Sequence, residues 1–295
     1  MTGMQIRPVA SDASMALDGQ YSAKTLEANA LRAQRRRRAL VISLRIAIFV
    51  VVVGTWEIAG RRGWIDPFFF GLPSGISRQI FEWWTEGTSQ GPLWVQVLVT
   101  LEETTAGFVI GAGAGVVCGI ALGRNRFLAD VFSIYIKIGN SIPRVVLGSI
   151  FIISLGLGMA SKVALAVVMV FFVVFANAFQ GVREADRAMI ANAEILGASR
   201  WQVTTTVVIP AAMSWILASL HVSFGFALVG AVVGEFLGSR QGVGLLISTA
   251  QGAFNANGVF AAMIILAVMA LAAEYVLTLV ENHLVRWRPP ALADT

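Results

Sequence analysis

Basic side chains beside a broken apolar stretch are the groups of this chain best placed to do chemistry. Lys137 and Arg144 flank the interruption Gly139-Asn140-Ser141-Ile142-Pro143 in an apolar run between residues 131 and 157. A fixed cation in a medium of low dielectric attracts a negative charge strongly. The pattern therefore predicts a place where a small anion can bind or pass.

The break at Pro143 has two interpretations, which the sequence leaves open. Pro143 lacks a backbone donor, and Gly139 and Asn140 are poor helix formers. Irregular backbone at membrane depth needs protein or a water-filled cavity around it, and in transporters it often touches the substrate path. Under the first interpretation the residues that line a path are Lys137, Asn140, Ser141, Pro143, Arg144 and His221. Under the second, residues 127–138 lie at the interface, the span begins near Pro143 and Arg144 anchors it to headgroups.

Three further ionisable residues lie in or near apolar stretches: His221, Glu235 and Glu274. Such residues are costly in a membrane and face a bundle interior or a pathway, although for His221 a lone His bonded to a neighbouring helix is the preferred interpretation. They are too scattered to predict an integral membrane enzyme. Cys118 is the single cysteine. We expect no catalytic residue, no metal site and no cofactor.

A polar segment, residues 181–210, separates two apolar runs and reads as two short helices around one turn. Gly197 suits the left-handed position that ends a helix. Ser199 and Gln202 form the pattern of a capping box that starts a second helix. Pro210 is expected to mark the boundary of that helix. Such a polar hairpin must face water, where it offers a docking surface.

The composition defines the broad class. The chain has 295 residues, of which 57% are hydrophobic and 13% charged, and its mean hydropathy is +0.74. A spanning helix needs roughly 20 apolar residues. The runs of that length are 40–60, 101–122, 138–157, 162–180, 212–234 and 258–280. We therefore predict an all-α polytopic membrane protein with six transmembrane helices, because the runs are too long for barrel strands.

The distribution of Lys and Arg predicts the orientation. Residues 1–38, a polar arm, contain Arg7, Lys24, Arg32 and the run Arg35–Arg38. If the arm is cytoplasmic, the other basic residues on that side are Arg124, Arg126, Arg183, Arg187, Arg200, Arg286 and Arg288. The opposite face receives Arg61, Arg62, Arg78, Lys162 and Arg240. The positive-inside rule then places both termini in the cytoplasm. The net charge of +5 reflects topology and anionic lipid, and no nucleic-acid partner is expected.

The second apolar run contains a regular row of glycines, one every four residues. They are Gly107, Gly111, Gly115, Gly119 and Gly123. Small residues at this spacing let two membrane helices approach closely. The row predicts a helix-packing seam, and a seam that also slides during a conformational change is equally compatible with the spacing.

The polar hairpin resembles the cytoplasmic EAA loop of binding-protein-dependent ABC transporter permeases: EAA, three residues, Gly, nine residues, then I-x-L-P. With the Gly on Gly197, the tail falls on Val207-Val208-Ile209-Pro210 and the leading Glu is replaced by Ala191. The coupling residues carried over are Glu184, Asn192, Ala193, Glu194, Gly197, Ala198, Ser199, Arg200 and Pro210. Further motifs look like the nitrate/sulfonate/taurine branch: Leu72-Pro73-Ser74, Glu235-Phe236-Leu237-Gly238, Gly242-Val243-Gly244-Leu245 and Trp287-Arg288.

The resemblance implies a type I ABC importer permease in a bacterial inner membrane. Its domain would cover residues 39–288, with a tail at 289–295. Such permeases form a dimeric pore, usually of two identical chains. They bind two cytoplasmic ATPase subunits, which hydrolyse the ATP. They also bind an extracytoplasmic binding protein. The substrate would be a small anion such as nitrate, a sulfonate or taurine. Aromatic residues crowd the segment 60–96, which fits either an interfacial belt or a docking surface for the binding protein.

The alternative interpretation of the sequence is an ion-coupled secondary transporter. An ion-coupled secondary transporter would show inverted repeats with paired broken helices. The sequence shows one break and no matching second one. Co-purification with an ATPase would separate the two classes.

Overall fold

The computed structural model describes residues 10–284. The tail at 289–295 and the Trp287-Arg288 pair lie outside this range. The chain divides into two compact units, residues 1–65 and 66–295. The described part is built of α-helices joined by short connections, apart from one isolated bridge between Thr88 and Gly91. The prediction of an all-α membrane protein is confirmed.

The first unit consists of one long helix, α1 (Ala10–Arg61). Its apolar part, Gln34–Arg61, has 28 residues. At about 1.5 Å per residue this part is long enough to cross the roughly 30 Å hydrocarbon core. The polar arm and the first predicted span are thus parts of one continuous helix from residue 10 onward.

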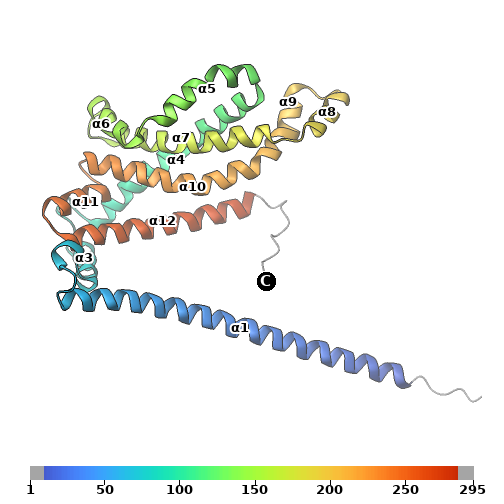
Figure 1. Cartoon of the computed structure of the whole chain (residues 1–295), viewed down its shortest axis with the longest axis horizontal. Helices are drawn as coiled ribbons and strands as arrows, with labels where there is room; N and C mark the ends of the chain where they lie inside the picture. The colour runs from blue at the N-terminus through green and yellow to red at the C-terminus, as the bar shows by residue number, and fades with distance from the viewer. Residues whose placement is uncertain (1–9, 285–295) are drawn as a thin grey trace, which may run out of the picture. The chain divides into compact units, whose positions relative to one another are not determined.

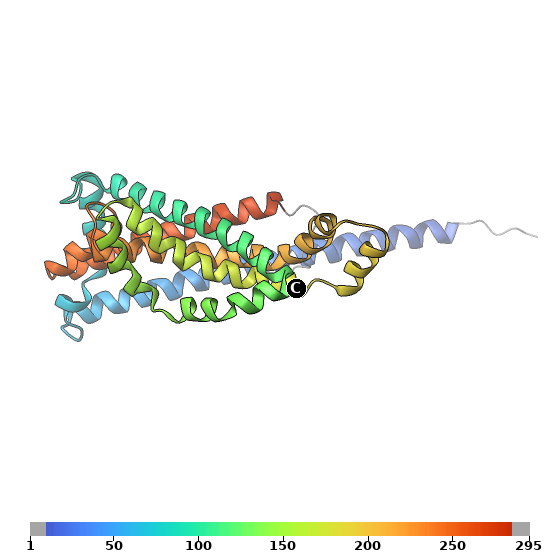
Figure 2. The same cartoon turned by 90° about the horizontal axis from the view of Figure 1, so that it is seen from above.

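Three long helices form the centre of the second unit: α4 (Leu93–Arg124), α7 (Met159–Arg183) and α10 (Ile209–Leu237). Helices α4 and α7 run in the same direction and pack on each other, and α10 runs in the opposite direction and packs against both (Figures 1 and 2). The short helices α8 (Arg187–Ile195) and α9 (Arg200–Val203) lie at one end of these three, the hairpin end. The opposite end carries the connections from α6 to α7 and from α10 to α11.

The glycine row of α4 lies against α7. An added Cβ on Gly107 would come within 2.3 Å of Ala166, and one on Gly119 within 2.6 Å of Ala178. Positions Gly111, Gly115 and Gly123 are equally tight, at 2.8–2.9 Å from α7 atoms. Because lipid provides no hydrophobic drive for association, this close approach of backbones is what holds the two helices together.

The third predicted span is divided between α5 (Arg126–Ser141) and α6 (Arg144–Leu155), which meet at an angle of 87°. The break predicted in the apolar run 138–157 is therefore present, because Ile142 and Pro143 adopt extended dihedral angles. With its 12 residues, α6 is about 18 Å long and cannot cross alone. The described residues hold five helices long enough to span a membrane, or six if the bent pair counts as one.

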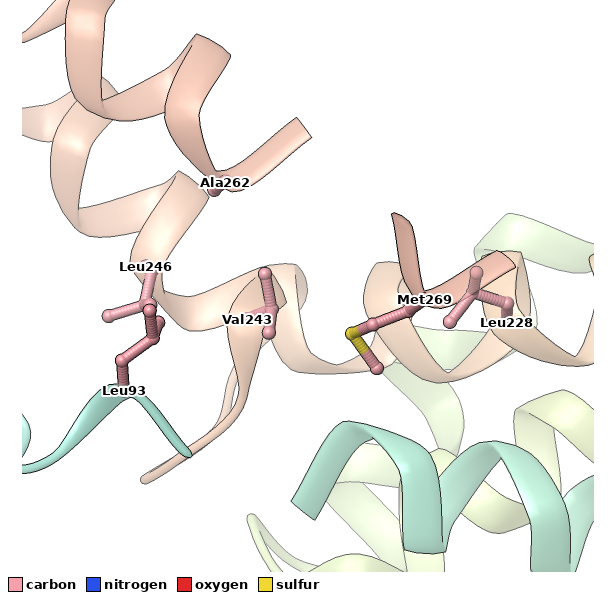
Figure 3. Packing of buried hydrophobic residues seen from close by; sticks show 6 residues of the cluster. All are labelled: Leu93, Leu228, Val243, Leu246, Ala262 and Met269. Atoms are coloured by element: carbon pink, nitrogen blue, oxygen red, sulfur yellow. The ribbon is translucent and has the colours of Figure 1, made fainter. Parts of the chain in front are cut away.

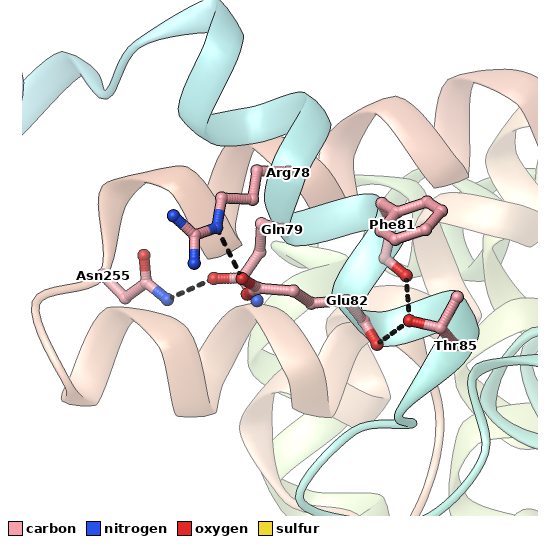
Figure 4. A network of polar contacts seen from close by, with 6 residues as sticks. All are labelled: Arg78, Gln79, Phe81, Glu82, Thr85 and Asn255. Carbon is pink, nitrogen blue, oxygen red and sulfur yellow. Dashed lines mark hydrogen bonds and ion pairs between the residues drawn. The ribbon is translucent and has the colours of Figure 1, made fainter.

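The opposite end is completed by α2 (Pro67–Phe70), α3 (Pro73–Thr85), α11 (Val243–Gly252) and α12 (Ala256–Leu284). Leu93, Leu228, Val243, Leu246, Ala262 and Met269 form the apolar cluster that joins α11 to α4, α10 and α12 (Figure 3). Asn255, in the turn before α12, donates to Gln79 of α3 at 3.0 Å (Figure 4). Arg78 and Glu82 pair along α3 at 2.8 Å beside this contact.

Candidate functional site

The polar hairpin has a rigid turn at its tip. Asp186 caps the start of α8 by accepting the amide of Ala188 at 2.7 Å. At the other end Gly197 takes φ +84°, while the amides of Gly197 and Ala198 bond to the carbonyls of Glu194 and Ala193, each at 3.0 Å. This is a Schellman motif, which satisfies carbonyls that the end of a helix leaves free. The predicted left-handed glycine is confirmed.

The second arm of the hairpin starts at the predicted capping box. The amide of Ser199 donates to Oε1 of Gln202 at 2.8 Å, and the amide of Gln202 donates to Oγ of Ser199 at 3.3 Å. Two amides at the start of α9 are thereby satisfied by side chains. The turn between the arms is therefore fixed from both sides, and its shape is set by residues 193–202.

Pro210 does not end the second arm, contrary to the prediction from sequence. Residues Thr204–Val208 form a π-helical turn, and Val208 and Ile209 keep helical dihedral angles. The segment Arg200–Leu237 is therefore one helix of 38 residues. The missing donor of Pro210 is accommodated by widening the preceding turn, a device that is frequent at functional sites. Motion at the hairpin can thus be passed directly into α10.

The two faces of the hairpin differ in exposure. Ile190, Ala193, Ala198 and Val203 pack into an apolar cluster with residues of α7 and α10. On the outer face Ile195, Leu196 and Trp201 are 83%, 86% and 72% exposed. Large apolar side chains at the tip of a polar hairpin mark a contact surface. We call Ile195, Leu196 and Trp201 the apolar tip.

Basic residues surround the root of the hairpin. Arg124 at the end of α4 donates to the carbonyl of Arg200 at 3.0 Å. A cavity of about 300 Å³ lies beside it and is lined by Arg124, Arg183, Arg187 and Glu194 among others. Glu184 accepts from the amide of Gln180 on α7 at 2.9 Å. The exposed side chains of Asn192 and Glu194 lie on α8.

The corner between α5 and α6 gathers five of the six residues predicted to line a path. Arg144 donates to the side chain of Asn140, and its guanidinium lies 5.4 Å from the ring centre of Phe172 on α7. Ser141 donates to the carbonyl of Lys137 at 2.8 Å. Pro143 starts α6, and the corner is close to α7 because Gly139 leaves room for the Phe172 ring. Arg144 is half-buried by this packing.

His221, the sixth predicted path residue, belongs to a different place. Its Nδ1 lies 3.0 Å from Oε1 of Glu274, so the pair connects α10 with α12. The interpretation of His221 as a residue bonded to a neighbouring helix therefore fits this geometry. His221 and Glu274 had been considered separately because 53 residues separate them in the chain.

A buried polar site in the helix bundle was missed by sequence reasoning, which had singled out only Glu235 of its members as an ionisable residue near an apolar stretch. Glu103 of α4, Lys162 of α7 and Glu235 of α10 are buried together at the end opposite the hairpin. Glu235 accepts from the Thr100 hydroxyl at 2.7 Å and from the amide of Gly244 at 2.6 Å, and Lys162 donates to the carbonyls of Leu157 and Gly158. Lys162 was predicted for the side of the membrane opposite the hairpin, and at that end its side chain is buried within the bundle. The cost of ionisable groups in membranes could have drawn attention to Glu103.

The comparison with protein families decides the class. Residues 111–287 match the family of inner membrane components of binding-protein-dependent transport systems. The chain belongs to this family and is thus an ABC transporter permease, a multi-pass inner-membrane protein. Membership decides against the ion-coupled secondary transporter and implies a binding protein and an ATPase as partners.

Individual relatives have diverse names. The aliphatic sulfonates transport permease protein SsuC of Bacillus subtilis (strain 168) is 29% identical over 81% of this chain and 85% of its own length. The riboflavin transport system permease protein RibX of Chloroflexus aurantiacus is 28% identical over 87% and 94%. The taurine transport system permease protein TauC of Escherichia coli (strain K12) is 24% identical over 83% and 90%. The predicted sulfonate/taurine branch is among these relatives.

Solved structures confirm the importer fold. One is an amino acid ABC transporter, with a TM-score of 0.52 and 20% identity over 64% of this chain and 92% of that one. Another is a methionine ABC transporter in an inward-facing conformation, with a TM-score of 0.51 and 19% identity over 66% and 93%. The predicted type I importer architecture is therefore confirmed for the helical core.

Proposed function

We propose that this chain forms the translocation path of an ATP-driven importer for small organic anions of the sulfonate or taurine type. Two of the relatives above carry such substrates in their names. The riboflavin relative is named for a much larger molecule, so the names of the relatives do not decide between a small anion and a larger substrate. The half-buried guanidinium of Arg144 favours the anion, because it keeps its charge in any surroundings.

The apolar tip is the basis for the proposed coupling between this chain and an ATPase subunit. A hairpin whose turn is fixed by a Schellman motif and a capping box presents Ile195, Leu196 and Trp201 on a backbone of defined shape. Pre-organised apolar anchors give binding energy at low entropic cost. We infer that this surface lies in a groove of an ATPase subunit, and that the continuous helix from Arg200 to Leu237 transmits the motion of that subunit. The ATPase subunit, and not this chain, hydrolyses ATP.

The assembly follows from this assignment. Two copies of this chain, each with one ATPase subunit, would enclose the path. Both termini and the hairpin lie in the cytoplasm under this proposal, which the Lys and Arg distribution supports. The binding protein then meets the opposite end, where Phe68, Phe69 and Phe254 are exposed.

A matched pair of tryptophans tests the docking surface. Trp201 at the tip and Trp84 on α3 are 72% and 73% exposed, so neither truncation should unfold the protein. We expect Trp201→Ala to weaken co-purification of the ATPase by at least about tenfold, since buried aromatic anchors dominate interfaces. Leu196→Asp should act in the same direction. Trp84→Ala should leave the ATPase bound, and equal binding in all variants would contradict the assignment.

Substitutions of Arg144 test whether this residue lines the translocation path. Arg144→Gln removes the charge but keeps a side chain that can bond to Asn140. We expect taurine uptake by the complete transporter to fall by about tenfold or more, with the ATPase still bound and its basal activity kept. Arg144→Lys should rescue uptake only in part, because an ammonium cannot form the planar, two-pronged contact to a sulfonate. Full rescue by Lys would indicate an anchor to lipid headgroups instead.

A further inference from the structure

The buried polar site at the end opposite the hairpin holds the start of α11. Three successive amides there, those of Gly242, Val243 and Gly244, have no partner within their own helix. The amide of Gly242 donates to Oε1 of Gln96 at 2.8 Å, and that of Val243 to Oγ1 of Thr100 at 2.9 Å. The amide of Gly244 donates to Oε2 of Glu235 at 2.6 Å. Side chains of α4 and α10 thus satisfy three amides at the start of α11.

The capping residues are also bonded to one another. The Thr100 hydroxyl donates to Oε1 of Glu235 at 2.7 Å, so one threonine joins α4, α10 and α11. A carboxylate at the amino end of a helix is favoured by the helix dipole. The close fit requires glycines in α11, since a Cβ on Gly242 would lie 2.2 Å from the Glu235 carboxyl group, and one on Gly244 would lie 2.4 Å from the carbonyl of Val232.

Lys162 extends the same site to α6. Its Nζ donates to the carbonyls of Leu157 at 2.5 Å and Gly158 at 3.1 Å, in the connection that follows α6. Gly234 of α10, the residue before Glu235, leaves room for the Lys162 side chain beside it. One buried group of side chains therefore fixes the end of α6 and the start of α11.

Both of these helices are too short to span a membrane. With 12 and 10 residues, α6 and α11 are about 18 Å and 15 Å long, against roughly 30 Å of hydrocarbon. The connections that the site holds also border a cavity of about 280 Å³, lined by Leu157, Gly158, Ser239, Arg240 and Gln241 among others. This space lets the two connections shift if the hydrogen bonds open. The hydrogen bonds at the end of α6 and the start of α11 therefore add to side-chain packing in positioning these two helices.

We propose that Gln96, Thr100, Glu235 and Lys162 are positioning residues for transport. They hold α6 and α11 together and so set the opening of the path at the end that receives substrate. This proposal rests on the proposed function, because α6 leads directly from the Arg144 corner to the Lys162 contact. The four residues act through the two short helices and need no contact with the substrate.

Two buried threonines of α4 provide a matched test. Thr100 bonds to Val243 and Glu235, whereas the hydroxyl of Thr104, one turn further on, donates to the carbonyl of Thr100 in its own helix. Both side chains are fully buried, and Val has nearly the volume of Thr. The complete transporter is measured in nanodiscs by hydrogen exchange of the peptide 242–252 and by ATP hydrolysed per taurine transported.

We expect Thr100→Val to speed exchange at the start of α11 by about tenfold, the factor for one lost buried hydrogen bond. The ratio of ATP hydrolysed to taurine transported should rise at least about threefold, because the start of α11 no longer holds the opening of the path in one position. Thr104→Val should match the wild type in both measurements. Should Thr100→Val fail to assemble, Gln96→Leu frees the Gly242 amide and gives the same readout.

The outcomes distinguish the positioning role from the proposed function as an importer permease. Unchanged exchange in Thr100→Val, or equal acceleration in Thr100→Val and Thr104→Val, would overturn the positioning role. So would faster exchange with an unchanged ratio of ATP to taurine. Exchange of α11 amides requires neither an ATPase nor taurine, whereas failure of the proposed function would appear as a wild-type complex that lacks the ATPase or does not transport taurine.

Discussion

Helix α4 meets its neighbours in two chemically different ways along its length. From Gly107 to Gly123 it contacts α7 through missing side chains, with backbone and methyl groups in direct contact. From Gln96 to Glu103 it contacts α7, α10 and α11 through buried polar and charged groups. The first region depends on shape, and the second depends on charge and hydrogen bonding.

The two regions should respond oppositely to the same kind of change. The packed glycine seam has no free space, so it should not tolerate added side-chain volume. A change of polarity that adds no volume should matter less there. A buried polar group tolerates changes of volume better than loss of a partner, because an unpaired charge in a medium of low dielectric is the costly state. The contrast can be tested on one helix pair.

The largest effect is expected for Lys162→Met. Met fills a similar volume but leaves the carbonyls of Leu157 and Gly158 without their donor and the buried carboxyl groups of Glu103 and Glu235 without a cation in the same site. Each buried group left without its partner costs about 1–3 kcal/mol, and more where it is charged. The measurement is the apparent melting temperature of the purified permease in detergent. The double variant with Glu235→Gln removes a negative charge together with the positive one. It should be more stable than Lys162→Met alone, and a double variant that melts lower than both single variants would show that charge compensation is not the reason.

The sequence alone predicted features whose partners are close together in the chain. The glycine row, the left-handed Gly197 and the capping box of Ser199 and Gln202 each depend on residues within one or a few turns. Local spacing determines such features, so they can be recognised without knowledge of the fold. The broad class followed from apolar runs for the same reason.

The polar site could not be predicted, because its members are far apart in sequence. Thr100 and Glu235 are separated by 135 positions, and each alone is an isolated polar residue near an apolar run. Pro210 illustrates a second limit, since the expected boundary was replaced by a π-helical turn that tertiary packing of Val203 and Val208 supports. The division of the third span was foreseen at Pro143, but the angle of 87° depends on how α6 packs on α7.

A smaller effect is expected for overpacking of the glycine row. A Cβ on Gly115 would lie 2.9 Å from Cβ of Val174 and 3.0 Å from the carbonyl oxygen of Phe171, so Gly115→Leu must push α7 away. Overpacking costs about 1–3 kcal/mol in well-packed soluble cores, less than we expect for Lys162→Met. The melting temperature of Gly115→Leu should therefore fall below that of the wild type but remain above that of Lys162→Met.

Gly113 is the control for this substitution, because it lies on the same helix two residues away with no atom within 4 Å of an added Cβ. Gly113→Leu adds the same side chain and removes the same helix-weakening glycine, so it should leave the melting temperature unchanged or raise it slightly. The difference between Gly115→Leu and Gly113→Leu isolates the shape of the seam from the helix propensity of leucine. If both variants melt alike, the contact between α4 and α7 is held by the polar region at residues 96–104, and the glycine row only permits the helices to lie close.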